Sequence, residues 1–197
     1  MSREYRNKSE PSAARKRAVV DESILLRDRA YDVAQVTLQF RDGSSRTRGI
    51  IRHRGAVIVL PLLDDGRIVL IRNHRWVVGR TLVELPAGGL EVGEEPIVAA
   101  ARECAEESGF RPQSVEHLGD FYTSPGFSDE RMYAFVAREL SPVGQHLEID
   151  ESIEVCPVSA GEALDMIDRG HIVDAKTIVA LLLAERRGLL GTRRNPS

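Results

Sequence analysis

Residues 84–110 read ELPAGGLEVGEEPIVAAARECAEESGF, and most of the structural information in the sequence lies here. The stretch opens as the end of a short strand that runs into a glycine-rich turn, and a helix follows. Glu94 and Glu95 stand at the helix start, where carboxylates favour the positive end of the dipole, and Pro96 suits the first turn. Gly109 stands where a C-terminal cap belongs. The pattern therefore predicts one helix between these signals.

The predicted helix has two different sides. Apolar residues recur at helical spacing and predict that the helix backs onto a sheet; they are Ile97, Ala100, Ala101 and Cys104. Glu103, Glu106 and Glu107 are spaced i, i+3 and i+4, so they share one face. We expect that face to be exposed and to lie opposite the apolar stripe.

Three carboxylates on one helix face repel each other unless a cation compensates. Hard cations such as Mg²⁺ and Mn²⁺ bind carboxylate oxygens and keep water or substrate phosphates as further ligands. Arg102 adds one fixed positive charge at the edge of the cluster. Two interpretations stay open for the helix alone, namely a metal site and an ordinary solvated acidic face.

Strand signals surround the helix. Alternating or β-branched runs predict strands over 31–40, 45–53, 56–63, 67–76, 81–90, 115–123, 131–139 and 152–158. Asp65-Gly66 between two apolar runs is a strong hairpin signal. Two further helices are predicted over 159–170 and 174–188. Hairpins together with helices indicate the α+β class, with helices packed over a mixed sheet.

One motif changes the balance between the two interpretations of the acidic helix. The sequence contains G-x5-E-x7-R-E-C-x-E-E-x-G-F, which runs from Gly88 through Glu94 and the acidic helix to Gly109 and Phe110. It resembles the Nudix box, G-x5-E-x7-R-E-U-x-E-E-x-G-U, at every fixed polar and glycine position. Cys104 stands where an aliphatic residue is usual, and a buried cysteine packs as a small hydrophobe.

The resemblance implies a Nudix α/β/α sandwich and a hydrolase that cleaves nucleoside diphosphates linked to another moiety. It implies Mg²⁺ or Mn²⁺ as cofactor, with two or three ions per site. Glu103 and Glu107 are then the core metal ligands, and Glu106 assists them. The carbonyl of Ala87 is the backbone ligand, and Arg102 orients the glutamates.

Two other segments resemble ADP-ribose pyrophosphatases and related nucleotide-sugar hydrolases. Residues 84–88 read ELPAG, and residues 122–130 read YTSPGFSDE, with Pro125 sixteen residues after Gly109. The resemblance implies substrate contacts from these segments and from the strand end at Arg75, whose guanidinium suits a diphosphate. The expected substrate-binding residues are Arg75, Glu84, Ser124, Pro125, Gly126 and Glu130. For the Ser-Pro-Gly sequence, a plain tight turn is the alternative.

The resemblance implies that the general base comes from an acidic loop, here residues 145–152, which read QHLEIDES. Glu148, Asp150 and Glu151 all qualify, and Glu148 and Glu151 rank equally. Each of them has the alternative of being a solvated loop charge.

The chain is expected to divide into four parts: a flexible basic tail (1–20), an N-terminal β segment (21–55), the Nudix domain (56–190) and a flexible C-terminus (191–197). Related enzymes are usually homodimers in which the N-terminal sheet helps to build the nucleotide pocket, so we expect a homodimer.

Composition excludes several classes of protein. The chain has 197 residues, a formal net charge of −3 and two cysteines. These values do not suit a disulfide scaffold, a zinc-ribbon module or a general nucleic-acid binder. No apolar run approaches the ~20 residues that span a bilayer. Because two cysteines cannot make a disulfide framework, a reduced, cytoplasmic protein is expected.

The resemblance implies ADP-ribose as the expected substrate, cleaved to AMP and ribose 5-phosphate, and three alternatives stay open. The enzyme could act on GDP-mannose or another nucleoside diphosphate sugar. It could act on RNA 5′ ends, for which the basic tail is the main argument. A non-catalytic Nudix module that binds a nucleotide is the third, although the box keeps all its glutamates.

Overall fold

The computed structural model describes residues 18–148 and 151–190. The expected N-terminal tail up to residue 17, the expected C-terminal tail at 191–197 and Asp150 lie outside these ranges. The described chain forms two compact units. The N-terminal unit ends at His53 and includes Gly126–Asp129 from much later in the sequence, whereas the larger unit contains the rest. The larger unit therefore starts at Arg54.

The N-terminal unit is a three-stranded antiparallel sheet with strand order β1-β2-β3. Its strands are β1 (Ala18–Arg27), β2 (Tyr31–Gln39) and β3 (Ser45–His53). The hairpin of β2 and β3 agrees with the alternation in the sequence. Gly126–Asp129 joins β3 through backbone hydrogen bonds from Ile51 N to Phe127 O (2.8 Å) and from Asp129 N to Ile51 O (3.2 Å). Sequence patterns do not reveal this pairing, because about 75 residues separate the partners.

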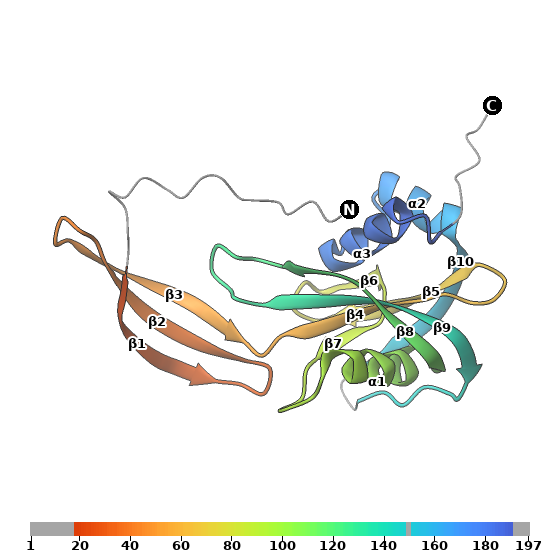
Figure 1. Cartoon of the computed structure of the whole chain (residues 1–197), viewed down its shortest axis with the longest axis horizontal. Coiled ribbons are helices and arrows are strands. Elements are labelled where there is room, and N and C mark those ends of the chain that lie inside the picture. The colour runs from red at the N-terminus through yellow and green to blue at the C-terminus, as the bar shows by residue number, and fades with distance from the viewer. Residues whose placement is uncertain (1–17, 149–150, 191–197) are drawn as a thin grey trace, which may run out of the picture. The chain divides into compact units, whose positions relative to one another are not determined.

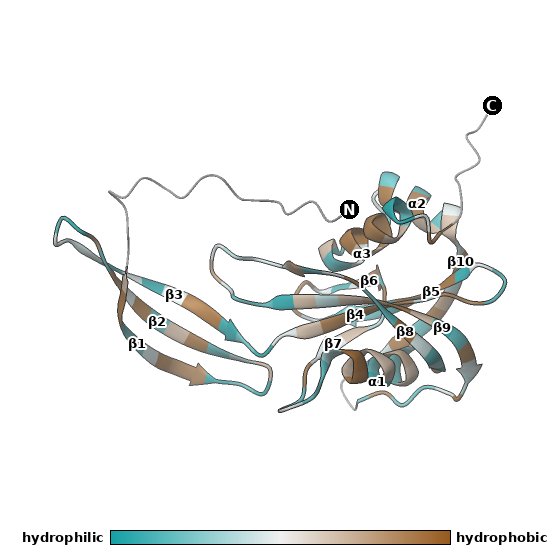
Figure 2. Cartoon of the chain, viewed as in Figure 1, coloured by the Kyte–Doolittle hydropathy of each residue, from teal (hydrophilic) through white to brown (hydrophobic). Residues whose placement is uncertain are grey.

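Strand β1 differs from the expectation, because residues 18–20 belong to it and not to a tail. Every residue of β1 is exposed, although Figure 2 colours much of the strand as hydrophobic. Its large apolar side chains are between 37% and 61% exposed; they are Val19, Val20, Ile24, Leu25 and Leu26. The polar run Asp21-Glu22-Ser23 interrupts the alternation that would have identified the strand.

The larger unit contains two sheets and three helices (Figure 1). One sheet has the order β7-β4-β9-β8, from β4 (Ala56–Pro61), β7 (Ala87–Gly89), β8 (Phe110–Tyr122) and β9 (Arg131–Pro142). The other has the order β10-β5-β6, from β5 (Arg67–Arg75), β6 (Arg80–Glu84) and β10 (Ile153–Ser159). Only β4 and β9 pair in parallel, so the sheet is mixed, as expected.

Helices cover both sides of these sheets (Figure 1). Helix α1 (Pro96–Ser108) lies on one side, and α2 (Ala160–Asp168) and α3 (Ala175–Arg186) lie on the other. All six residues of β4 are buried, because its alternate side chains enter two cores. Val57 and Val59 pack with α1, whereas Ile58 and Leu60 pack with β5, α2 and α3. No helix of the described chain is long and apolar enough to cross a membrane.

The two ends of helix α1 lie where the sequence predicted them, but the burial of its faces differs from the prediction. Pro96 stands in the first turn, and Gly109 caps the C-terminus with φ of 74°. Ile97, placed in the apolar stripe, is 48% exposed. Glu103 and Glu107, expected on an exposed face, are 8% and 2% exposed. Helical spacing identified the shared face of the glutamates but not the strand β7 that covers it.

Candidate active site

Arg102 connects the acidic residues of the box. Its guanidinium donates two hydrogen bonds to Glu94, of 3.0 and 2.9 Å. Nη1 also donates to Glu103 Oε1 (2.7 Å) and to Glu106 Oε2 (3.0 Å), and Nη2 reaches the carbonyl of Gly89. The hydrogen bonds from Arg102 lower the pKa of Glu94. Arg102 therefore brings together three carboxylates that are separate in the sequence.

Gly88 leaves the space that Glu103 occupies. A Cβ atom at residue 88 would lie 2.0 Å from Glu103 Oε1, far inside contact distance. The sequence predicted a glycine-rich turn at this place, but Gly88 lies in strand β7, paired with β4. The missing side chain thus makes a cradle for a carboxylate, which is a different reason for the same glycine.

Glu107 lies deepest in the cluster. Its Oε2 accepts a 2.7 Å hydrogen bond from the amide of Ala87. Burial raises the pKa of Glu107 to about 8 and that of Glu103 to about 7. Repulsion from Glu103 adds to the shift at Glu107, and repulsion from Glu106 adds to the shift at Glu103. Arg102 opposes the shift at Glu103 without cancelling it. The protein alone therefore leaves these two carboxylates short of compensating positive charge.

The donor set fits a hard divalent cation. Within residues 18–148 and 151–190, no three acidic, histidine or cysteine side chains are arranged to hold a metal directly, and Arg102 takes one oxygen each of Glu103 and Glu106. The carboxylate oxygens are nevertheless of the type that Mg²⁺ and Mn²⁺ prefer. The cradle at Gly88 and the two raised pKa values both indicate a place where added positive charge is favourable.

Residues 84–87 connect this cluster on α1 to three other elements, β4, β5 and α3. Glu84 accepts from Arg75 of β5 and from Lys176 of α3. The amide of Leu85 donates to Thr177 of α3 (2.9 Å), and the carbonyl of Pro86 accepts from β4. The amide of Ala87 reaches α1, as described above. Each residue of the segment is thus fixed by a different contact.

Arg75 and Glu84, both expected among the substrate-binding residues, form an ion pair with each other. Nε and Nη2 donate to the two carboxylate oxygens at 2.9 and 2.7 Å. Nη1 has no hydrogen-bond partner in the described part of the chain. Arg75 also lies close enough to Glu107 to lower the pKa of that carboxyl. One edge of the guanidinium is therefore held, and the other is available beside the acidic cluster.

The acidic loop is attached to the end of α1. Gln145 Nε2 donates to the carbonyl of Glu107 (2.7 Å) and to that of Ile153 (3.4 Å). Glu151 lies close enough to raise the pKa values of Glu103 and Glu107, and it accepts from the amide of Glu148. The structure therefore brings Glu151 to the cluster. Sequence reasoning missed Gln145, whose only signal is its place at the start of the loop.

The Ser-Pro-Gly segment is closed at its base. The Thr123 hydroxyl donates to the carboxylate of Glu130, and the amide of Thr123 donates to the carbonyl of Glu130. Pro125 and Gly126 are exposed, and Ser124 is half-buried. Glu130 thus shapes the turn, and contacts of these residues with substrate stay a prediction.

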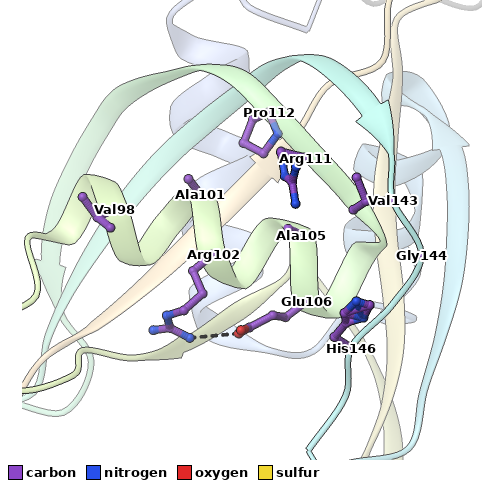
Figure 3. Close-up of a pocket in the computed structure, with 10 residues that line it drawn as sticks. All are labelled: Val98, Ala101, Arg102, Ala105, Glu106, Arg111, Pro112, Val143, Gly144 and His146. Carbon is purple, nitrogen blue, oxygen red and sulfur yellow. Dashed lines mark hydrogen bonds and ion pairs between the residues drawn. The ribbon is translucent and has the colours of Figure 1, made fainter.

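A cavity of about 570 Å³ lies on the outer side of α1 (Figure 3). Val98, Ala101 and Ala105 line it from the helix, on the face opposite Glu103 and Glu107. It shares only the ion pair of Arg102 and Glu106 with the acidic cluster. The cavity is therefore distinct from the predicted metal site.

Known proteins resemble this chain over most of its length. The NUDIX domain model matches residues 52–187. The ADP-ribose pyrophosphatase of Bacillus subtilis is 39% identical over 155 residues, which cover 78% of this chain and 84% of that protein. The GDP-mannose pyrophosphatase of Cronobacter sakazakii is 33% identical, covering 84% of this chain and 90% of that protein.

A solved structure shows the same fold. The crystal structure of an ADP compounds hydrolase superposes with a TM-score of 0.78 and 23% sequence identity, covering 90% of this chain and 97% of that one. This likeness confirms the mixed α+β architecture that the sequence predicted.

Proposed function

The chain belongs to the Nudix family, and from this membership we propose that it is a divalent-metal-dependent pyrophosphohydrolase whose substrate is ADP-ribose. The products would be AMP and ribose 5-phosphate. The observation that carries the proposal is the buried pair Glu103 and Glu107 beside the cradle at Gly88. The name of the Bacillus subtilis relative supports the choice of substrate.

Glu103 and Glu107 would hold Mg²⁺ or Mn²⁺, two or three ions per site, with Glu106 and the carbonyl of Ala87 as further ligands. When bound, the metal would polarise the diphosphate and lower the pKa of a bound water. Arg102 would hold Glu103 and Glu106 in place, because its guanidinium already contacts both.

The remaining chemistry falls to Arg75 and the acidic loop. Arg75 would bind the diphosphate with the guanidinium edge that Glu84 leaves available. Of the two base candidates, Glu151 is favoured because it lies close enough to influence both buried glutamates. A carboxylate there would accept a proton from the attacking water.

GDP-mannose is the second candidate substrate, since the Cronobacter sakazakii relative carries that activity in its name. Ser124, Pro125, Gly126 and Glu130 would contact the substrate in either case. The discriminating experiment measures hydrolysis of ADP-ribose, GDP-mannose, UDP-glucose and nucleoside triphosphates with Mg²⁺ or Mn²⁺, and identifies the products directly. Preference for ADP-ribose supports the proposal. Preference for another sugar nucleotide would replace ADP-ribose as the proposed substrate. Absence of any turnover would favour the alternative of a non-catalytic module that binds a nucleotide.

We further propose that the enzyme is a cytoplasmic homodimer that pairs through the N-terminal sheet, and that 56–190 is the catalytic domain. The exposed apolar side chains of β1 support the pairing, because soluble proteins rarely leave contiguous apolar surface uncovered. Light scattering coupled to gel filtration tests it, and a monomeric mass would contradict it.

A further inference from the structure

Lys176 of α3 occupies an unusual position for a lysine. Its Nζ lies 2.7 Å from Glu84 Oε2 and 2.9 Å from Asp174 Oδ1, and its side chain is 16% exposed. Lysine ammonium groups normally stay in water, and a covered one needs paired carboxylates. Here two carboxylates share one ammonium.

Glu84 connects this lysine to Arg75. The Glu84 side chain is completely buried, and its Oε2 lies 2.7 Å from Arg75 Nη2 and 2.7 Å from Lys176 Nζ. Burial alone would raise the pKa of Glu84, but the hydrogen bond from Arg75 and the charge of Lys176 outweigh it and lower the pKa. Glu84 is therefore held as a carboxylate by two cations, of which only Arg75 lies beside the acidic cluster.

The first turn of α3 fixes Lys176 independently. Asp174 is the N-cap residue and accepts hydrogen bonds from the amide and hydroxyl of Thr177. That hydroxyl in turn accepts from the amide of Leu85, next to Glu84. Helix α3 thus reaches residues 84 and 85 through two separate links, and it has little freedom to move Lys176 away.

The amino-acid composition of the chain also sets Lys176 apart. The sequence has 24 arginines and three lysines, and Lys176 is the only lysine after residue 16. A compact ammonium can be shared by two close carboxylate oxygens, whereas the planar guanidinium of arginine needs room for a fork. This rarity is the sequence signal that could have identified Lys176.

We propose that Lys176 is a positioning residue for substrate binding: through the Glu84 carboxylate it fixes the guanidinium of Arg75 that binds the diphosphate. The proposal rests on the proposed function of Arg75. Without the ammonium, Glu84 and Asp174 would repel each other, and Glu84 would lose one of its two counter-charges. Arg75 would then be oriented less firmly, so binding would weaken more than the chemical step.

A double-mutant cycle tests the proposal. KM and kcat are measured for Lys176→Met, Arg75→Gln and the double variant on the sugar nucleotide that the unaltered enzyme hydrolyses. We expect Lys176→Met to raise KM about tenfold, as loss of a charged hydrogen bond does, with kcat changed less. In the Arg75→Gln background the same change should have almost no effect on KM.

Matched variants separate positioning from general stability. Arg186→Met removes one exposed positive charge from the far end of the same helix, and KM should stay unchanged. Lys176→Arg should not restore KM, since shape and not charge alone is required. If Lys176→Met does not fold, Asp174→Asn keeps the helix cap, weakens the hold on Lys176, and should raise KM in the same coupled way.

Two results would overturn the proposal. One is an equal rise in KM from Lys176→Met with and without Arg75, because Lys176 would then act independently. The other is an unchanged KM in Lys176→Met. Failure of the proposed function is recognised separately, as an unaltered enzyme that hydrolyses no sugar nucleotide. In that case the affinity of the same variants for inorganic pyrophosphate with Mg²⁺ is measured by calorimetry. Equal weakening by Lys176→Met with and without Arg75, or no weakening at all, would then overturn the proposal.

Discussion

Residues 84–88 and strand β1 differ in how many of their groups find a partner elsewhere in the chain. In the first region, a glutamate, three backbone groups and a missing Cβ atom are each matched by a partner from another element. In β1, every residue is exposed and the apolar side chains have no cover. The comparison indicates that the proposed metal site depends on contacts completed within the larger unit, whereas strand β1 leaves apolar side chains exposed in the single chain.

The largest expected effect is at the buried end of this comparison. Glu107→Gln should lower kcat with Mg²⁺ by about a thousandfold or more, because a core ligand charge is lost. The fold should remain, since a neutral side chain suits a buried position whose carboxyl pKa is raised. Steady-state kinetics and circular dichroism measure both. The half-exposed Glu106→Gln is the control and should lose less; activity like wild type in Glu107→Gln would exclude the metal assignment.

Gly88→Ala tests the cradle. The new methyl group would meet the Glu103 carboxylate at 2.0 Å, so that carboxylate must move, and we expect about a hundredfold loss of kcat. Gly89→Ala is a close control, because nothing lies within 4 Å of a Cβ atom there, and its activity should stay near that of the parent. Equal activities of the two variants would contradict the role given to Gly88.

Glu84→Gln tests the buried ion pairs by stability. We expect a loss of about 2 kcal/mol in the free energy of unfolding at pH 7, because three hydrogen bonds from two cations lose their charged acceptor. The folded-state pKa of Glu84 is lowered, so its contribution is present above its unfolded value, 4.5, and is lost as the pH falls through the folded pKa. The free energy of unfolding in urea should therefore differ less between the parent protein and Glu84→Gln in acid than at pH 7. A constant difference across this range would mean that charge is not the cause.

The smallest effect on the larger unit is expected from β1. Leu25 is 61% exposed, so Leu25→Asp should change the free energy of unfolding of the larger unit by no more than about 0.5 kcal/mol. It should nevertheless convert the proposed dimer to monomer in gel filtration with light scattering. Arg27→Asp, at the end of the same strand, is the control for charge. A dimer that survives Leu25→Asp would place the interface elsewhere.

The elements that local patterns specify could be predicted, and the contacts between distant elements could not. Pro96 and Gly109 marked helix α1 correctly. Asp65-Gly66 marked the turn between β4 and β5, but the hairpin predicted there was wrong, because the two strands belong to different sheets and are joined by an isolated bridge between Leu62 and Ile68. The burial of Glu103 and Glu107 could not be read from helical spacing, because it depends on strand β7 passing over that face. Lys176 binds Glu84, from which it is 92 residues away in the sequence, and no local sequence pattern predicts such a contact.

The segment Gly126–Asp129 limits where the chain can be truncated or joined to another enzyme. Phe127 and Asp129 find their backbone partners on Ile51, and the Asp129 carboxylate accepts from Arg52 and from the amide of His53. A shortened gene that starts at Arg54 would delete all three partners and leave four residues in the middle of the remaining protein without them. The two units therefore cannot be exchanged between enzymes at a single junction, and a working chimaera must carry the loop together with the sheet.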